Sequence, residues 1–258
     1  MKTTILTVCL LAISFTSCGQ PSNYLPDAKA CNLSSDKPSS TETYEFDKGF
    51  NEYFTQSTRW ESHDADIQIV NGKGQLTANS DNVSNALEAW KLYKNQMPYN
   101  RSWEFSVVVN VPIYWNTNGG KEAQVGVGPF AGRPVEKGQS PKVYECNMAA
   151  INGEFRFVQA QLIKNRLGFD PDDVQFKKLP KSKEKATLTL QYCADHNSLG
   201  LFLDGVQVGK SKAINKEGAD DWQLNADDKI DVGIMGFAEN TVITSHSPTI
   251  EKVTVTVY

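Results

Sequence analysis

Apolar and polar residues alternate along most of the chain from about residue 44 onward. The run Trp103–Val111 shows this most clearly, because every second residue is large and apolar, the period of a strand with one buried face. Similar runs occur at residues 123–128, 143–149, 154–163, 186–192, 199–203, 230–237 and 249–258, separated by clusters of Gly, Pro, Asn and Asp. The pattern predicts many strands, and only residues 218–224 suggest a short helical turn.

The clearest local unit is the run Leu199–Val208, in which Asp204 and Gly205 separate two apolar segments. Asp-Gly supplies the two positive-φ positions of a tight turn, so the flanking strands are predicted to pair antiparallel. Many such strands must bury their apolar faces against one another. The sequence therefore predicts an all-β fold, a two-sheet antiparallel sandwich or jelly roll.

The first 18 residues have one lysine, a short apolar run and then small residues before Cys18, which is typical of a secretory signal peptide. Phe15–Cys18 is similar to a loose bacterial lipobox, which predicts acylation of the Cys18 thiol and export to the cell envelope as a lipoprotein. Residues 19–43 are rich in Ser, Pro, Asn, Asp and Lys and are predicted to form a flexible polar tether. An ordinary disordered N-terminus is the alternative. The folded domain is predicted to span residues 44–258.

The net charge and the hydropathy of the chain limit the binding partners that we expect. The net charge of −4 provides no basic surplus for a phosphate backbone, which argues against nucleic-acid binding. After the signal no apolar stretch approaches the roughly 20 residues that cross a bilayer, so membrane attachment is expected only through the lipid on Cys18.

The five cysteines do not suggest a disulfide scaffold in a chain of this length. Cys9 lies in the signal and Cys31 in the tether, which leaves Cys146 and Cys193 as the candidate pair within the domain. Alternation places Cys146 on a core face and Cys193 on the face of Thr189 and Gln191. We expect a buried free thiol at Cys146 and an exposed Cys193, with a disulfide between them as the alternative.

Several segments together resemble the concanavalin A-like lectin/glucanase superfamily. They are Phe46–Phe50 leading to Trp60, the turn Gly72–Leu76, the hairpin Leu201–Gly205, and Val232–Phe237 followed by a last strand at Ile250–Val257. The resemblance covers residues 44–258 and implies a jelly roll whose concave sheet binds saccharides, in lectins without catalysis and in glycoside hydrolases with it.

The chain departs from the catalytic and metal patterns of that superfamily. The Glu-x-Asp-x-x-Glu strand of laminarinase-like members is missing, and Val143–Ile151 offers only Glu145 and Asn147 where two carboxylates are needed. The metal ligands of legume lectins are not visible either, so no metal site is carried over.

Four polar residues are predicted to form a binding surface on the concave face: Gln124, Glu145, Asn147 and Arg156. Each lies opposite core-facing neighbours, and Gly126 and Gly128 beside Gln124 would leave room for a ligand. The alternative is an ordinary solvated face, with Glu145 and Arg156 as a weak cross-strand ion pair.

Sugar sites also use aromatic platforms, for which Trp90, Tyr93, Tyr114 and Trp115 are suitable by type. Trp115 lies in a turn-rich segment and is either a platform or a lid on the core, whereas the other tryptophans, Trp60, Trp103 and Trp222, are expected to pack inside. The three scattered histidines, His63, His196 and His246, lack zinc-site spacing. Acidic pairs in Asp170–Asp173 and at residues 220–221 and 227–228 could hold calcium, although they are also ordinary turn and cap residues.

Three functions remain open from the sequence. The leading one is noncatalytic recognition of a glycan or polysaccharide by an exported lipoprotein. The second is a glycoside hydrolase or lyase, with Glu145 as the first residue to test. The third is a structural or adhesion lipoprotein that contacts another protein.

Overall fold

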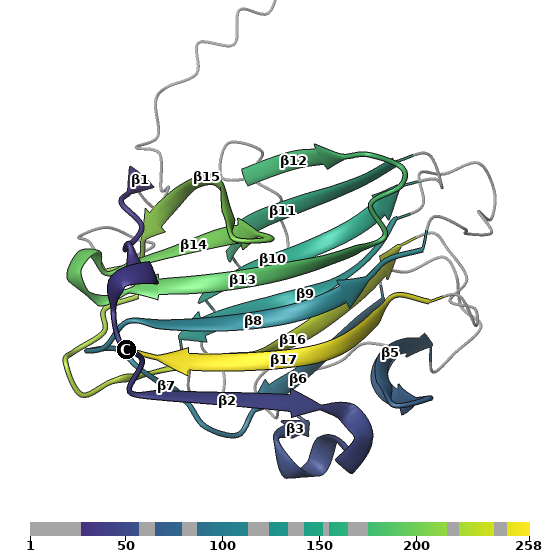
Figure 1. Cartoon of the computed structure of the whole chain (residues 1–258), viewed down its shortest axis with the longest axis horizontal. Helices are drawn as coiled ribbons and strands as arrows, with labels where there is room; N and C mark the ends of the chain where they lie inside the picture. The colour runs from purple at the N-terminus through teal and green to yellow at the C-terminus, as the bar shows by residue number, and fades with distance from the viewer. Residues whose placement is uncertain are drawn as a thin grey trace, which may run out of the picture.

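The computed structural model describes residues 27–56, 65–78, 87–112, 124–133, 142–151, 155–164, 175–215, 222–239 and 247–258. Two antiparallel sheets pack face to face as a jelly-roll sandwich (Figure 1), which confirms the predicted all-β fold. Within these described ranges no helix is long and apolar enough to span a membrane.

The nine-stranded sheet has the order β1 (Asp27–Ala28), β15 (Val206–Ala213), β14 (Ser198–Leu203), β13 (Lys185–Cys193), β8 (Trp103–Asn110), β17 (Thr249–Val257), β5 (Lys73–Ala78) and β4 (Ala65–Val70), with β2 (Ser40–Glu45) also paired to β17.

The eight-stranded sheet has the order β12 (Gln175–Leu179), β11 (Phe155–Lys164), β10 (Lys142–Ile151), β9 (Gln124–Arg133), β16 (Lys229–Glu239), β6 (Leu87–Tyr93) and β3 (Phe54–Gln56), with β7 (Met97–Pro98) also paired to β16. Short 3-10 turns at Leu33–Ser35, Phe46–Lys48, Phe50–Glu52 and Ala194–His196 complete the described elements.

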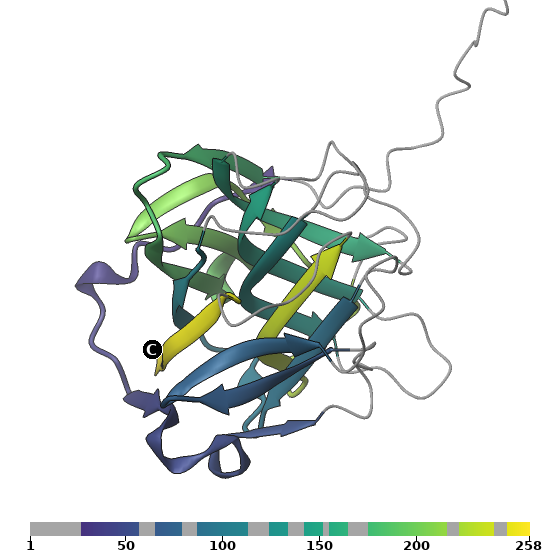
Figure 2. The ribbon, with the colours of Figure 1, turned by 90° about the vertical axis from the view of Figure 1, so that its right-hand side faces the viewer.

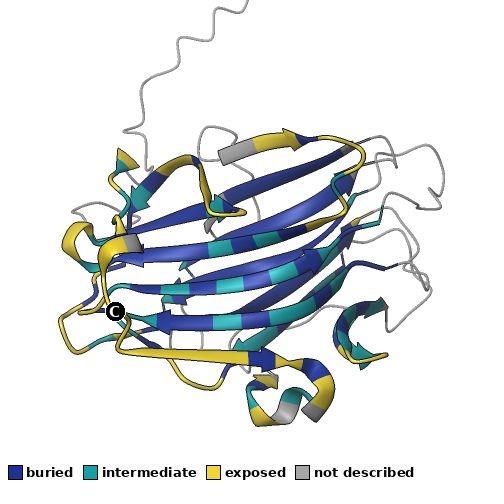
Figure 3. Ribbon diagram, in the orientation of Figure 1, coloured by how far each residue is buried: buried dark blue, intermediate teal, exposed yellow. Residues whose placement is uncertain are grey.

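The predicted alternation places the core between the sheets. Along β8 buried and half-buried residues alternate without interruption, and Figure 3 shows the same banding on the neighbouring strands. The Asp204-Gly205 turn between β14 and β15 has positive φ at both residues, 48° and 80°, which confirms the predicted hairpin. Each run predicted from alternation overlaps a strand of the structure, although residues 123 and 154 lie outside the described ranges and β17 ends at Val257.

The two sheets differ in their outer faces. The nine-stranded sheet carries polar and half-buried side chains outward, including a hydrogen-bonded pair of hydroxyls, Ser106 and Thr189. In the eight-stranded sheet β9 and β16 are buried on both faces over almost their whole length. The outward-facing side chains of these two strands are therefore shielded from solvent, as the core-facing ones are, and this outer face holds the candidate site.

A charged group on the outer face of the nine-stranded sheet links three of its strands. Glu251 on β17 accepts hydrogen bonds from Lys185 on β13 and from Lys73 on β5, the latter at 2.7 Å. The Lys185 hydrogen bond, followed by that from Lys73, holds the pKa of Glu251 below its ordinary value. This carboxylate therefore stabilises the fold in its ionised form.

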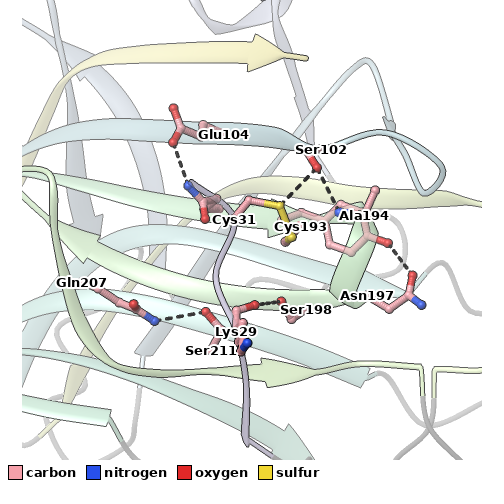
Figure 4. The surroundings of a disulfide bond; sticks show 12 residues. Lys29, Cys31, Ser102, Glu104, Cys193, Ala194, Asn197, Ser198, Gln207 and Ser211 are labelled. Atoms are coloured by element: carbon pink, nitrogen blue, oxygen red, sulfur yellow. Dashed lines mark hydrogen bonds between the residues drawn. A yellow bond between two sulfur atoms is a disulfide. The ribbon is translucent and has the colours of Figure 1, made fainter. Parts of the chain in front are cut away.

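Residues 27–45, called here the N-terminal strap, run along the outside of the nine-stranded sheet (Figure 2). At one end β1 pairs with β15, and at the other β2 pairs with β17. Between them a disulfide joins Cys31 to Cys193 at the end of β13 (Figure 4). Residues 27–43, predicted as part of a flexible tether, are thus held to the sandwich, because strand pairing and a covalent bond fix them.

The disulfide also corrects the cysteine prediction. Cys193 was expected to be exposed, but it is buried, because the strap covers its face of the sheet, and its partner is Cys31. The buried free thiol predicted at Cys146 is confirmed. Alternation places a residue on a face of its own sheet and carries no information about a distant segment that covers that face. Cys18 and residues 19–26 lie outside the described residues.

Candidate functional site

The candidate site lies on the outer face of the eight-stranded sheet, centred on β10. Tyr144, Cys146 and Met148 point into the core between the sheets, as predicted. Glu145 and Asn147 alternate with them and therefore point outward. The face predicted for these two residues is confirmed.

Three polar residues on this face, called here the polar row, are nearly inaccessible to solvent. Glu145 is 4% exposed, Asn147 0% and Gln159 8%. Gln159 stands directly opposite Asn147 on β11. Polar side chains are usually buried only when they find partners, so each one needs an account.

Asn147 is the exception to that rule. Neither its Oδ1 nor its Nδ2 atom has a hydrogen-bond partner in the described part of the chain. An amide buried in this way costs about 1–3 kcal/mol relative to one that is hydrogen-bonded. The outer face thus presents one unsatisfied donor–acceptor group.

Beside the polar row lies a group of apolar residues, called here the outer apolar cluster. Its buried members are Trp90, Phe130, Val143 and Met235, and the half-buried Leu92 and Phe237 pack against them. The Trp90 and Phe130 rings meet edge to face, with centroids 5.0 Å apart. This cluster is separate from the main core, and with the polar row it gives the outer face both kinds of surface that a sugar contacts.

The glycines of β9 have a different role from the one predicted. A Cβ atom at Gly128 would collide with the carbonyl oxygen of Cys146 and lie 2.7 Å from the Cα atom of Asn147, and one at Gly126 would lie 2.7 Å from the Phe237 ring. These glycines are required because neighbouring groups approach the backbone closely. Room for a ligand does not explain them.

Gln124, the first residue of β9, is partly exposed and pairs with Glu239 on β16 and Ile151 on β10. It lies on the outer face, but four residues along the strand from Gly128, a distance of about 13 Å. The structure therefore places Gln124 at the end of the face, away from Asn147.

The prediction for Arg156 is wrong. Arg156 stands opposite Ala150 on the core side of the sheet and is fully buried. Its guanidinium donates to the carbonyl oxygens of Val111 and Lys181 and, at 3.2 Å, to Glu184.

Glu145 is paired in register with Gln161, so the alternative Glu145–Arg156 cross-strand pair is also wrong. The alternation of residues around Arg156 predicted that its side chain lies on the polar face of the strand. The side chain of arginine is long enough, however, for its guanidinium to reach carbonyl groups at the edge of the core. Arg156 joins the two sheets and is not part of the outer face.

The aromatic candidates divide between core and outer face. Trp103 and Trp222 are fully buried in the main core, as predicted, and Tyr93 also belongs to it. Trp90 lies in the outer apolar cluster. Tyr114, Trp115 and Trp60 lie outside the described residues.

Sequence reasoning missed Gln159, Phe130 and Met235. All three alternate with core residues, which was the available signal, but only the register across β11, β10, β9 and β16 brings them beside Asn147.

Cysteine and metal chemistry find no support at the site. Burial, and to a smaller extent the Glu145 charge, raise the pKa of the Cys146 thiol well above its ordinary value, so it is not a thiolate nucleophile. No group of three potential metal ligands occurs among the residues that the structure describes. Asp228 accepts a hydrogen bond from the Asn225 backbone at 2.7 Å, the turn role considered for it. Residues 170–173 and 220–221 lie outside the described ranges.

A second carboxylate shares the face with Glu145. Asp231 on β16 is fully buried and accepts a hydrogen bond from Gln96 at 2.6 Å. It pairs with Gly132 and lies two strands from Glu145 and one pleat along, which places the two Cα atoms about 12 Å apart. In a retaining glycosidase the two carboxyl groups are about 5–5.5 Å apart, which favours neighbouring backbone positions. The backbone does not place Glu145 and Asp231 in such neighbouring positions.

Comparison with solved structures supports the fold. The carbohydrate recognition domain of Emp46p matches with a TM-score of 0.50 and 13% identity, covering 81% of this chain and 89% of that chain. An endo-1,3-beta-glucanase from Streptomyces sioyaensis matches with a TM-score of 0.51 and 13% identity, covering 86% and 98%. A scan against family models and a search of curated proteins find no match. The chain thus has a concanavalin A-like jelly-roll fold, as the sequence resemblance predicted.

Proposed function

We propose that this protein binds a glycan on the outer face of the eight-stranded sheet. The observation that carries the proposal is the unsatisfied amide of Asn147, buried between Glu145 and Gln159 and beside the outer apolar cluster. Saccharides present hydroxyl groups that donate and accept hydrogen bonds, and C–H faces that pack on apolar side chains. The polar row and the outer apolar cluster match these two properties.

The described surface gives less support to a protein-docking role. Val206 is the one large apolar side chain exposed in the described ranges, and a single such residue is ordinary. An adhesion surface built on an apolar patch would need several neighbouring ones. This favours the glycan-binding function over the structural alternative.

The same proposal includes an extracytoplasmic location. The Cys31–Cys193 disulfide supports it, because disulfides persist in oxidising compartments and are rare in the cytosol. Anchoring through Cys18 is tested by Cys18→Ser, which should move the protein from the membrane fraction to the soluble fraction. Unchanged partitioning would rule out the lipid anchor.

A glycan array followed by titration calorimetry tests binding, with Gln159→Leu as the variant and Gln191→Leu as its control. Gln191 is also a buried glutamine, 5% exposed, but it lies on the outer face of the other sheet and donates to Glu104. Gln159→Leu should weaken binding about tenfold, the effect of losing one or two hydrogen bonds, whereas Gln191→Leu should leave it unchanged. Equal effects of the two variants, or no saccharide bound by wild type, would contradict the proposal.

Hydrolysis is the second candidate, favoured by the buried carboxylates Glu145 and Asp231 on one face. It predicts that wild type releases reducing ends from the bound polysaccharide and that Glu145→Gln abolishes this release without abolishing binding. Binding with no turnover by wild type would exclude hydrolysis and leave glycan recognition.

A further inference from the structure

One edge of the sandwich is formed by the last strands of both sheets. β1 and β15 lie at the end of the nine-stranded sheet, and β12 lies at the end of the eight-stranded sheet. β12 packs against β15, and Figures 1 and 2 both show β12, β15 and β1 along the same side of the molecule. These strands and the turns that adjoin them, residues 27–29, 175–185 and 198–213, are called here the basic edge.

The basic edge carries more positive than negative charge. It contains eight lysines and three carboxylates, although the whole chain has a net charge of −4. The lysines are Lys29, Lys177, Lys178, Lys181, Lys183, Lys185, Lys210 and Lys212. All of them except Lys183 and Lys212 are exposed. Their charges are therefore presented to solvent on one side of the molecule.

The ion pairs among the described residues do not neutralise this edge. The pairs are Asp27 with Lys210 and Lys212, Asp204 with Lys183, Glu251 with Lys185, and Glu184 with the buried Arg156. Even when Glu251 of β17 is counted, the lysines are twice as numerous as the carboxylates. A positive potential therefore remains over the basic edge, and it favours an anionic partner.

The N-terminal segment joins the domain at the same edge. Asp27 is the first described residue and pairs with Lys212 of β15. Nine residue steps lead from Cys18 to Asp27, and a chain of this length spans at most about 30 Å. A lipid on Cys18, as proposed above, would keep the basic edge close to a bilayer. A short linker also raises the effective concentration of the surface to which it is attached.

We propose that the basic edge docks on a bilayer surface that contains anionic phospholipids. The proposal goes beyond glycan binding, and only the nearness of the membrane rests on the proposed anchor at Cys18. Each lysine close to such a surface strengthens binding about fivefold. The attraction is reversible and acts within a Debye length of about 10 Å, so it supplements a lipid chain and does not replace it. Docking by an edge leaves the faces of both sheets uncovered.

The test measures how the full chain partitions into vesicles, with Cys18→Ser in every protein so that no lipid on that residue contributes. Vesicles with about 30% phosphatidylglycerol in phosphatidylcholine are compared with phosphatidylcholine alone, at about 50 mM salt. The readout is the ratio of the two partition coefficients, because any contribution of the apolar N-terminal run is common to both vesicles. We expect a ratio well above one that falls towards one as salt is added.

Two triple variants show whether the basic edge is responsible. Lys177→Gln, Lys178→Gln and Lys181→Gln together should lower the ratio about a hundredfold, or about fivefold for each lysine. The control combines Lys94→Gln, Lys229→Gln and Lys252→Gln, which remove the same charge after β6 and in β16 and β17, away from this edge. The control should keep the ratio within about twofold of that of the parent. Both variants should keep the unfolding midpoint of the parent.

Three outcomes would overturn the proposal. Equal partition of the parent into the two vesicles would show no lipid recognition, and the lysines of β12 would then only protect an edge strand from pairing. An equal fall in both triple variants would mean that net charge governs binding and that this edge does not. Binding to dextran sulfate without a preference for anionic vesicles would assign the edge to an acidic polysaccharide. The glycan array uses no vesicles, so failure of glycan binding is seen separately.

Discussion

Replacing Asn147 by leucine distinguishes a residue kept for a ligand from one kept for the fold. Leucine has nearly the shape of asparagine but no polar atoms. The amide of Asn147 is fully buried with no partner in the described part of the chain, so its removal relieves an uncompensated desolvation cost. We expect Asn147→Leu to raise the free energy of unfolding by about 1–3 kcal/mol.

The assay is urea denaturation followed by tryptophan fluorescence, together with a thermal scan. For a domain of this size each kcal/mol corresponds to a rise of about 2–4 °C in Tm. The same variant should lose the glycan affinity of the wild-type protein. A gain in stability together with a loss of binding is the pattern expected of a functional residue.

Asn215→Leu provides the matched control. The Asn215 amide donates to the Tyr99 hydroxyl at 2.6 Å and to the Leu224 carbonyl at 3.0 Å, and accepts from the Leu224 backbone at 3.0 Å. Losing these three bonds should lower the free energy of unfolding by about 2–4 kcal/mol. If Asn147→Leu instead lowers stability by more than about 1 kcal/mol, or binds glycan as wild type does, the reasoning about this amide is refuted.

Four further predictions concern the fold around the site. Cys31→Ser removes the disulfide that closes a loop with a sequence separation of 162, and it should lower the free energy of unfolding by about 2–5 kcal/mol. A reducing agent should lower the stability of wild type but not of the variant. Equal stability of the two proteins without reductant would contradict a stabilising role of the Cys31–Cys193 disulfide. Arg156→Met should lower the free energy of unfolding by about 3 kcal/mol, because it leaves buried carbonyl groups without a hydrogen-bond donor. Calorimetry should show unchanged glycan binding by the folded variant, and weakened binding would mean that Arg156 belongs to the binding site. Gly128→Ala should lower the free energy of unfolding, measured by urea denaturation, by about 1–3 kcal/mol. An unchanged stability would show that β9 and β10 can move apart at Gly128 to accommodate a methyl group. Because the folded-state pKa of Glu251 is lowered, its contribution to stability is present above its ordinary pKa of 4.5 and is lost as the pH falls below that value. The urea concentration at the unfolding midpoint of wild type should therefore decrease as the pH is lowered below about 4.5, and the decrease should be smaller in Glu251→Gln.

Strand positions were predictable because each depends on local alternation. The apolar face of β8 and the Asp204-Gly205 turn follow from a few neighbouring residues, and the structure reproduces both. The outward direction of Glu145 and Asn147 follows from the same rule.

What alternation could not supply is pairing between distant segments. Cys31 joins Cys193 only because the strap crosses the end of β13, and no local pattern records that path. The burial of Gln159 and Met235 beside Asn147 depends on strand order, which places β11, β10, β9 and β16 side by side. Arg156 shows a further limit of prediction from alternation. Its long side chain reaches backbone carbonyl groups at the edge of the core, and these contacts cannot be read from its position in the alternating pattern.

The Cys31–Cys193 disulfide also determines how the domain responds to tension. A pulling force applied before Asp27 reaches the short β1 pairing first and then passes through the disulfide into β13, which lies between β14 and β8 in the nine-stranded sheet. The rest of the strap, including the pairing of β2 with β17, stays unloaded. In a protein held by its N-terminal end, load entering through the strap would therefore reach the middle of the nine-stranded sheet without peeling a strand from the sandwich beyond β1.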